Sequence, residues 1–293
     1  MIQKLTSHQL PIQRIALIGA GGKMGCRIMD HLKNHPDYAL RCVESAPAGL
    51  AKLDSRGLVA MPMSEAVAEA DAVILALPDR VLGKVAAEVV PHARSGALII
   101  MLDPASAHAG EMPPREDVSY FVSHPCHPNV FDHFETEPER NDFFGGTHAR
   151  QAIVCALMQG PESDYARGEK IAMDFWAPVT KSHRVTVPQM ALLEPAMAET
   201  VGIALIRALR EALEEVVARG VPRAAAEDFL YGHIKVPLGI AFDRVDFPFS
   251  DGAKLIASYG ATQVLRDDWK KVFEPESVRA QCIAITTGKL PQG

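Results

Sequence analysis

His124 and His127 flank the short segment Pro125-Cys126 and are the first residues whose chemistry suggests a site. A neutral histidine can take the proton of a hydroxyl group near neutral pH, as oxidation of an alcohol requires. The apolar run 118–123 directly before His124 predicts a buried strand. We therefore expect His124 at the carboxyl end of that strand, with His127 and Asn129 contacting a substrate. The alternative is a structural role, since the chain has 11 histidines.

Glu194 is the second candidate, because it stands between leucines and Pro195 in an otherwise apolar segment. A buried charge needs a partner, so a cation or metal ion nearby would explain this carboxylate. Glu199 follows five residues later and, at 3.6 residues per turn, would point about 140° away. Unless Pro195 distorts that turn, we expect only one of the two carboxylates to face a site. The alternative for Glu194 is to cap the helix start.

His233 and Lys235 lie inside a later helical pattern. Their positive or polar ends could bind the carboxylate of a substrate. They could equally be solvated positions on the outer face of a helix.

A glycine-rich turn follows the apolar run 14–18 and precedes an amphipathic helical pattern. Glycines at such a turn let the backbone approach a dinucleotide pyrophosphate, which the helix N-terminus attracts. The spacing departs from G-x-G-x-x-G, and we favour the register that ends in Gly22 and Gly25, with Gly19 as an extra turn residue. The residues expected to bind this cofactor are Ala20, Gly21, Gly22, Lys23, Met24 and Gly25. The alternative is a turn without a ligand.

Glu44 closes the next strand pattern, 38–43, at about the interval expected for a ribose-binding carboxylate, roughly 20 residues. Its charge would repel a 2′-phosphate, and Ser45-Ala46-Pro47 offers no arginine, so NAD is favoured over NADP. The alternative for Glu44 is a solvated residue at a strand end. Pro78 and Asp79 end the apolar run 72–77 and are expected near the nicotinamide.

Short apolar strands alternate with helical patterns up to about residue 187, and long helical patterns dominate afterwards. Continuous apolar strands are buried on both faces, which indicates a parallel sheet covered by helices. We therefore predict an α/β protein with an N-terminal Rossmann-type, doubly wound sheet over residues 1–187. Residues 188–293 are predicted to form an all-helical domain for substrate binding and dimerisation. Apolar positions spread around the helix 189–219, so we expect a homodimer.

Composition points to a small-molecule ligand. The net charge of −6, without a basic cluster, argues against nucleic acid. The first 11 residues lack a signal-peptide core and no later run could span a bilayer, so a cytoplasmic protein without membrane partners is expected. Five scattered cysteines suggest neither a disulfide framework nor a zinc knuckle.

Four segments together resemble the bacterial D-apionate oxidoisomerase family, and the similarity covers nearly the whole chain. They are GAGGKMG at 19–25, ALPD at 76–79, SHPCHP at 123–128 and QAIVCALMQGP at 151–161. The resemblance implies a helical domain like that of 6-phosphogluconate dehydrogenases. It also implies NAD-dependent oxidation of a branched sugar acid, D-apionate, with migration of a carbon substituent to give 3-oxo-isoapionate.

The resemblance has implications for metal binding as well. Ketol-acid reductoisomerase, in the same broader group, binds divalent metal through acidic residues spaced Asp-x-x-x-Glu, whereas this chain has Glu194 and Glu199. We therefore expect at most one ion, Zn²⁺ or Mg²⁺, held between His124 and Glu194 to polarise the reacting oxygens. The lysine and asparagine of 6-phosphogluconate dehydrogenases are absent from this segment, which disfavours simple decarboxylation.

Two other functions are compatible with the residues. One is a plain NAD-dependent dehydrogenase of a sugar-derived hydroxy acid, with His124 as the base. The other is an NAD-binding sensor without catalysis, which the grouping of reactive side chains disfavours. A product with a rearranged carbon skeleton would distinguish an oxidoisomerase from both of these alternatives.

Overall fold

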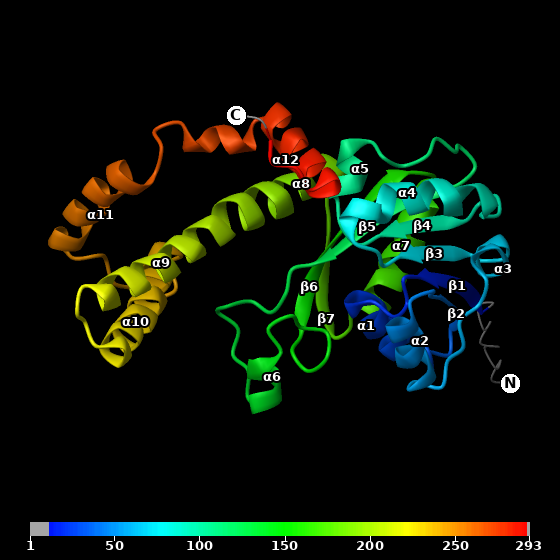
Figure 1. The fold of residues 1–293 in the computed structure, drawn as a ribbon, viewed down its shortest axis with the longest axis horizontal. Helices are drawn as coiled ribbons and strands as arrows, with labels where there is room; N and C mark the ends of the chain where they lie inside the picture. The colour runs from blue at the N-terminus through cyan, green and yellow to red at the C-terminus, as the bar shows by residue number, and fades with distance from the viewer. Residues whose placement is uncertain (1–11, 292–293) are drawn as a thin grey trace, which may run out of the picture. The chain divides into compact units, whose positions relative to one another are not determined.

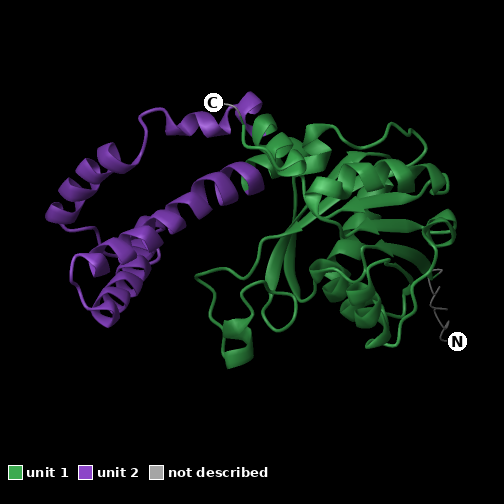
Figure 2. Cartoon of the chain, viewed as in Figure 1, with its two compact units in different colours: residues 1–193, 279–293 green, residues 194–278 purple. Residues whose placement is uncertain are grey.

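The computed structural model describes residues 12–291. The expected lack of a signal peptide concerns residues 1–11, which lie outside the described residues. The chain forms two compact units, the first comprising residues 1–193 and 279–293 and the second residues 194–278 (Figure 2).

The first unit is built on one seven-stranded sheet with the order β2-β1-β3-β4-β5-β6-β7 (Figure 1). Strands β1 to β5 run parallel to their neighbours, β6 is antiparallel to β5, and β7 is parallel to β6. The strands are β1 Gln13–Ile18, β2 Tyr38–Val43, β3 Ala72–Leu75, β4 Leu98–Met101, β5 Ser119–Pro125, β6 Gln151–Gln159 and β7 Val179–Arg184.

Helices cover both faces of this sheet. The helices of this unit within residues 12–191 are α1 Lys23–Leu32, α2 Pro47–Asp54, α3 Met63–Ala68, α4 Asp79–Val89, α5 Ala105–Ala109, α6 Glu137–Asn141, α7 Glu162–Phe175 and α8 Val187–Ala191, with the 3-10 turn η1 Val90–His92. Of these, α6 lies in a loop and buries none of its residues. Neighbouring residues of β1 enter opposite cores: Ala16 packs with α3, α4 and α8, and Leu17 packs with α1, α2 and α7. The predicted doubly wound α/β fold is confirmed, because helices pack on both faces of the sheet. Strands that are buried on both faces require these two helical layers.

The second unit is entirely helical within the described residues. It contains most of the π-helical segment η2 Leu192–Ile203, then α9 Ala204–Ala218, α10 Arg223–Ala241, α11 Asp251–Val264, the 3-10 turn η3 Trp269–Phe273 and the start of α12 Pro275–Thr287. The helical C-terminal region is thus as predicted. The boundary predicted at residue 187 differs from the boundaries of these two units. Helix α8 and the residues from Arg279 onward belong to the unit that contains the sheet. The assignment of substrate binding and dimerisation to the helical part stays a prediction.

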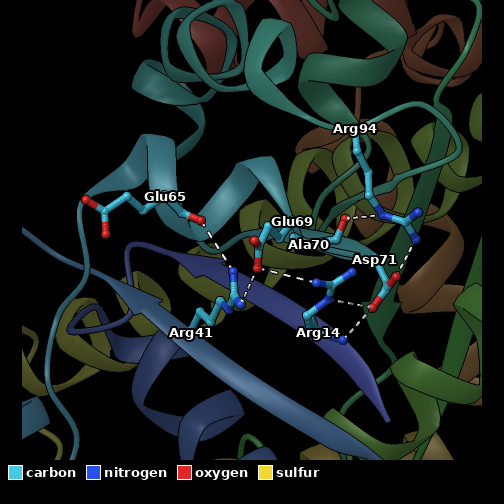
Figure 3. A network of polar contacts seen from close by, with 7 residues as sticks. All are labelled: Arg14, Arg41, Glu65, Glu69, Ala70, Asp71 and Arg94. Carbon is cyan, nitrogen blue, oxygen red and sulfur yellow. Dashed lines mark hydrogen bonds and ion pairs between the residues drawn. The ribbon is translucent and has the colours of Figure 1, made fainter. Parts of the chain in front are cut away.

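An ion-pair network ties together the amino ends of β1 and β3 (Figure 3). Asp71, just before β3, accepts the backbone N–H of Arg14 at 2.7 Å and pairs with the Arg94 side chain. Glu69 pairs with Arg14 at 3.3 Å and with Arg41 at 2.8 Å. These contacts lie at the edge opposite the carboxyl ends of the strands, so they hold the sheet without occupying the ligand edge.

Candidate active site

The glycine turn between β1 and α1 adopts a shape that side chains would block. Gly19 has a left-handed φ of +78°, which lets the chain turn sharply out of β1. Gly22 is the N-cap of α1 without a side-chain cap bond. A Cβ at Gly25 would collide with the Gly19 carbonyl oxygen and lie 2.5 Å from that of Ala20. The helix therefore packs tightly on the turn, and its first free N–H groups can face an anion, in keeping with the favoured register.

Glu44 follows β2 and its carboxylate is held against this turn. One oxygen accepts the backbone N–H of Gly21 at 2.9 Å, and the other accepts those of Ser45 and Ala46 at 2.8 Å. Burial on its own would raise the pKa of Glu44, but the backbone donors of Ala46, Ser45 and Gly21 outweigh it, so the pKa lies below its ordinary value. The carboxylate is therefore ionised and fixed beside the turn. A Cβ at Gly21 would collide with the Gly49 Cα and lie 2.7 Å from this carboxylate, and the close approach of the Gly49 backbone explains the glycine.

Lys23 and Met24 open α1 and differ in direction. The Lys23 ammonium lies 3.3 Å from the ring centroid of Phe144 and makes a cation–π contact with it. Met24 is half-buried and packs against the core on the α1 side of the sheet. Lys52 donates to the Gly21 carbonyl oxygen at 3.0 Å and adds a cation near Glu44. Phe144 and Lys52 were not predicted, because no motif links them to the turn.

His124 lies inside β5, which runs on to Pro125; the expectation that His124 follows the strand is therefore wrong by two residues. The strand is longer because β6 supplies it with an antiparallel partner at these positions. His124 Nδ1 lies 2.8 Å from the Leu102 carbonyl oxygen. Since a carbonyl only accepts, Nδ1 carries the proton and Nε2 keeps a lone pair. Burial lowers the pKa of His124 to about 4, so the imidazole is neutral.

Two carboxylates gather beside His124 at the same edge. Asp79 is the first residue of α4, after exposed Pro78, and Asp103 follows β4 with an oxygen 3.9 Å from His124 Nδ1. Burial raises the pKa of Asp79 to about 6, and the charge of Asp103 adds to the rise. Strand β3 ends at Leu75, two residues before the predicted end. The carboxyl ends of neighbouring parallel strands thus bring these groups together, as open α/β sheets do.

His127 lies beside Phe144, the ring that also contacts Lys23 of the cofactor turn. It has a left-handed φ of +60°, uncommon for a residue with a side chain, and its Nδ1 lies 2.9 Å from the Phe144 carbonyl oxygen. Its ring centroid is 6.2 Å from that of His124. Asn129 is exposed and its side-chain oxygen accepts the backbone N–H of Phe131 at 2.9 Å, so its amide NH₂ and the second lone pair of that oxygen remain for a ligand.

A cavity of about 530 Å³ opens beside His127. It lies where β5 ends and where β6 and β7 begin. Its wall includes His127, Asn129, Asp132, Arg150 and Lys181. The last two cations were not predicted, because only the pairing of β6 with β7 brings them near the histidine.

The remaining predicted residues belong to the helical unit. His233 is exposed on α10, its Nδ1 lies 2.8 Å from the Phe229 carbonyl oxygen, and its ring stacks on that of Phe229 at 3.9 Å. Lys235 is exposed on the same helix. Glu194 begins the second unit, so a contact with His124 stays a prediction. In residues 12–291, no group of three or more His, Cys, Asp or Glu side chains is placed to hold a metal ion.

The relation between Glu194 and Glu199 differs from that in a regular α-helix. Both lie in the π-helical segment, where hydrogen bonds run from residue i to i+5 and a turn takes more than four residues. Residues five apart therefore lie closer together around the axis than the roughly 140° of an α-helix, which is the exception that the expectation allowed for Pro195; Glu194 is half-buried and Glu199 is exposed. Pro195 contributes, because it has no N–H to donate within an α-helix.

A helix N-terminus shaped for phosphates shares a sheet edge with a neutral imidazole, an arrangement suited to removing hydride from an alcohol. Fold and site thus define a Rossmann-type oxidoreductase. Two family models match in agreement with this class. Residues 14–102 match "NADP oxidoreductase coenzyme F420-dependent", and residues 132–286 match "Phosphogluconate dehydrogenase (decarboxylating) C-term".

The chain belongs to the D-apionate oxidoisomerase family. It is 48% identical to the D-apionate oxidoisomerase of Rhizobium rhizogenes over 273 residues, which are 93% of this chain and 99% of the relative. It is 44% identical to that of Cupriavidus necator over 276 residues, 94% of this chain and 99% of the relative. The family resemblance deduced from the four motifs is confirmed.

Solved structures show the same fold. A semialdehyde dehydrogenase NAD-binding protein from Cupriavidus necator, in complex with calcium and NAD, has a TM-score of 0.91 at 43% identity, covering 94% of this chain and 99% of that one. An NADH-preferring ketol-acid reductoisomerase from an uncultured archaeon has a TM-score of 0.63 at 18% identity, covering 94% of this chain and 82% of that one. The second likeness concerns the fold alone.

Proposed function

We propose that this chain oxidises D-apionate with NAD and rearranges its carbon skeleton to give 3-oxo-isoapionate. The names of relatives at 48% and 44% identity support the substrate. The observation that carries the proposal is the neutral imidazole of His124, held by the Leu102 carbonyl oxygen on the same sheet edge as the glycine turn.

NAD fits the residues of the turn. The backbone of residues 20–25 would hold its pyrophosphate, Glu44 would accept the hydroxyls of its ribose, and Pro78 and Asp79 would border its nicotinamide. The ionised Glu44 disfavours a 2′-phosphate, and Lys52, the cation nearby, is engaged by the Gly21 carbonyl oxygen. The solved relative bound to NAD supports this cofactor. Bound NAD would accept a hydride from the substrate carbon.

His124 acts as the general base in this proposal. Its Nε2 accepts the hydroxyl proton while the carbon loses hydride, so a carbonyl forms and the imidazole becomes a cation. Burial opposes that cation, and the carboxylates of Asp79 and Asp103 offset the charge. The imidazolium can then return its proton to an oxygen after the carbon substituent has migrated. His127 and Asn129 would orient the substrate beside it.

A divalent ion is a separate part of the proposal. The solved relative holds calcium, and Glu194 and Glu199 both lie in the π-helical segment. The described side chains contain no group of three or more metal ligands, so no catalytic step is assigned to an ion. Removing metal with a chelator would test the requirement: an ion shared by His124 and Glu194 predicts lost turnover with unchanged NAD affinity.

A homodimer formed through the helical unit completes the proposal. Helices α9, α10 and α11 expose many large apolar side chains, among them Ile206, Phe229, Leu255, Ile256 and Tyr259.

The cytoplasmic location stays a prediction. None of the helices in residues 12–291 is long and apolar enough to cross a membrane.

Incubation of the purified protein with NAD and a panel of branched and linear aldonic acids tests the activity. The absorbance of NADH should rise with D-apionate and much less with linear acids. The His124→Asn variant, which keeps the shape of the side chain but loses the base, should abolish the signal while binding NAD normally. A variant with full activity would move the base elsewhere.

A further inference from the structure

We propose that Arg150 and Lys181 bind the carboxylate of the sugar-acid substrate in the cavity beside His127 and so determine its specificity. This inference deepens the proposed function and rests on it for the identity of the acid. It concerns two cations that lie outside the cofactor turn and outside the His124 group.

The floor of the cavity is a row of residues from three neighbouring segments of the sheet. The backbone N–H of Cys126, just after β5, donates to the Ala152 carbonyl oxygen of β6 at 2.9 Å, and Ala152 pairs with Lys181 of β7. The small side chain of Ala152 leaves a hollow between its two neighbours. Residues two apart in an extended chain share a face, so Arg150 emerges on the Ala152 side, whereas Gln151 is 2% exposed and points into the core.

The cavity carries cations that have no ion-pair partner. Neither Arg150 nor Lys181 lies within ion-pair or side-chain hydrogen-bond distance of another residue in the part of the chain that the structure describes, although the charge of Arg150 helps to lower the pKa of Glu139. The charge of Lys181 partly offsets the rise that burial causes in the pKa of the Cys126 thiol, another residue of the cavity wall. Asp132 supplies one carboxylate to the wall. A guanidinium and an ammonium in one hollow form a site for a carboxylate, which Arg can bind through two parallel hydrogen bonds.

The position of the hollow connects it to the chemistry. His127 belongs to its wall, and the His127 ring centroid is 6.2 Å from that of His124. A volume of about 530 Å³ lies within the range of small-molecule sites. An acid held there by its carboxylate would extend its hydroxyl-bearing carbons past His127 toward His124. The Asp132 carboxylate would accept hydrogen bonds from the hydroxyl groups of a polyhydroxy acid.

Binding and kinetics of charge-removing variants test the inference. Arg150→Gln, Lys181→Gln and the double variant are compared with Lys84→Gln, which removes an exposed lysine of α4 outside the cavity. Two ligands are used, D-apionate and its uncharged amide. For the double variant we expect Kd and KM for D-apionate to rise about tenfold or more, as loss of charged hydrogen bonds implies. Values for the amide, the affinity for NAD and all values of the control should stay within about twofold.

Several results would overturn the inference. They are unchanged Kd and KM for D-apionate, equal losses for the acid and the amide, or a lower kcat with unchanged KM, which would indicate an effector anion. Lys181→Arg keeps the charge and should retain most of the affinity that Lys181→Gln loses. If the wild type binds D-apionate without turning it over, the proposed function fails and the carboxylate site is still measured by Kd. Absence of binding to the wild type would contradict both.

Discussion

Burial decides how His124 can act as a base. Its Nδ1–H is committed to the Leu102 carbonyl oxygen, and the surrounding protein disfavours a positive ring, so Nε2 is an available lone pair throughout the neutral range. Such a base is unprotonated at Nε2 before the substrate binds. The substrate hydroxyl must therefore be acidified as hydride leaves, with Asp79 and Asp103 balancing the charge that forms.

Titration of His124 gives the first prediction. In the chelator-treated protein without ligands, its imidazole should stay neutral until about pH 4, well below the ordinary pKa of 6.5. Because a base works in its neutral form, protonation of His124 should not reduce kcat/KM between pH 5 and 8. Nitrogen NMR of the imidazoles measures this, and comparison with His124→Asn assigns the signal. A midpoint near 6.5 would contradict the burial argument.

Glu44 carries the second prediction. Its ionised carboxylate should favour NAD over NADP by about tenfold or more in kcat/KM, because it accepts ribose hydroxyls and repels a 2′-phosphate. Glu44→Ala should narrow that ratio. Steady-state kinetics with both cofactors measures it, and Glu69→Ala, a distant exposed carboxylate, serves as the control. Equal use of both cofactors by the wild type would refute the role of Glu44.

Residues of the site differ in how far sequence could predict them. Glu44 and the glycines are local to one strand-turn-helix unit, so spacing along the chain was enough to place them. Phe144, Arg150 and Lys181 reach the site only through loop folding and strand pairing, for which no local pattern exists. For His233 and Lys235 only charge suggests substrate binding, which stays a prediction; His233 stacks on Phe229.

At the scale of elements, hydrophobic runs predicted which segments form strands but not where each strand ends. The end of β5 depends on its partner: Val154 and Ile153 of β6 pair with His124 and Pro125 and extend the strand over them. The start of the long helix shows the same limit. Helical periodicity was evident there, yet its π-helical hydrogen bonding altered the relation of Glu194 to Glu199.

The network at the amino edge of the sheet gives the third prediction. Asp71→Ala removes the acceptor of the Arg14 backbone N–H and the partner of Arg94, so the free energy of unfolding should fall by about 1–3 kcal/mol. Glu69→Ala, an exposed member of the same network, should change it by about 0.5 kcal/mol or less. Urea unfolding measures both, and equal effects would contradict the assigned role of Asp71.

At the scale of the whole molecule, the helices of the second unit leave many large apolar side chains exposed in a single chain, and we propose that a second copy covers them. Static light scattering in dilute solution should give about twice the chain mass of 31.8 kDa. Ile206→Asp places a charge on α9, where Ile206 is 67% exposed, and should shift the protein toward monomer. Val59→Asp, at a residue 83% exposed in the sheet unit, is the matched control. A stable wild-type monomer would contradict the proposed dimer.

Carbon NMR of the product formed from ¹³C-labelled D-apionate and NAD tests the central claim most directly. If His124 removes the hydroxyl proton in an oxidoisomerase, NADH and product should form in equal amounts, and the product should have a new carbon–carbon connectivity, that of 3-oxo-isoapionate. Formation of NADH with the original skeleton intact would contradict the rearrangement and indicate a plain dehydrogenase. Binding of NAD without any reduction would contradict catalysis and indicate a sensor.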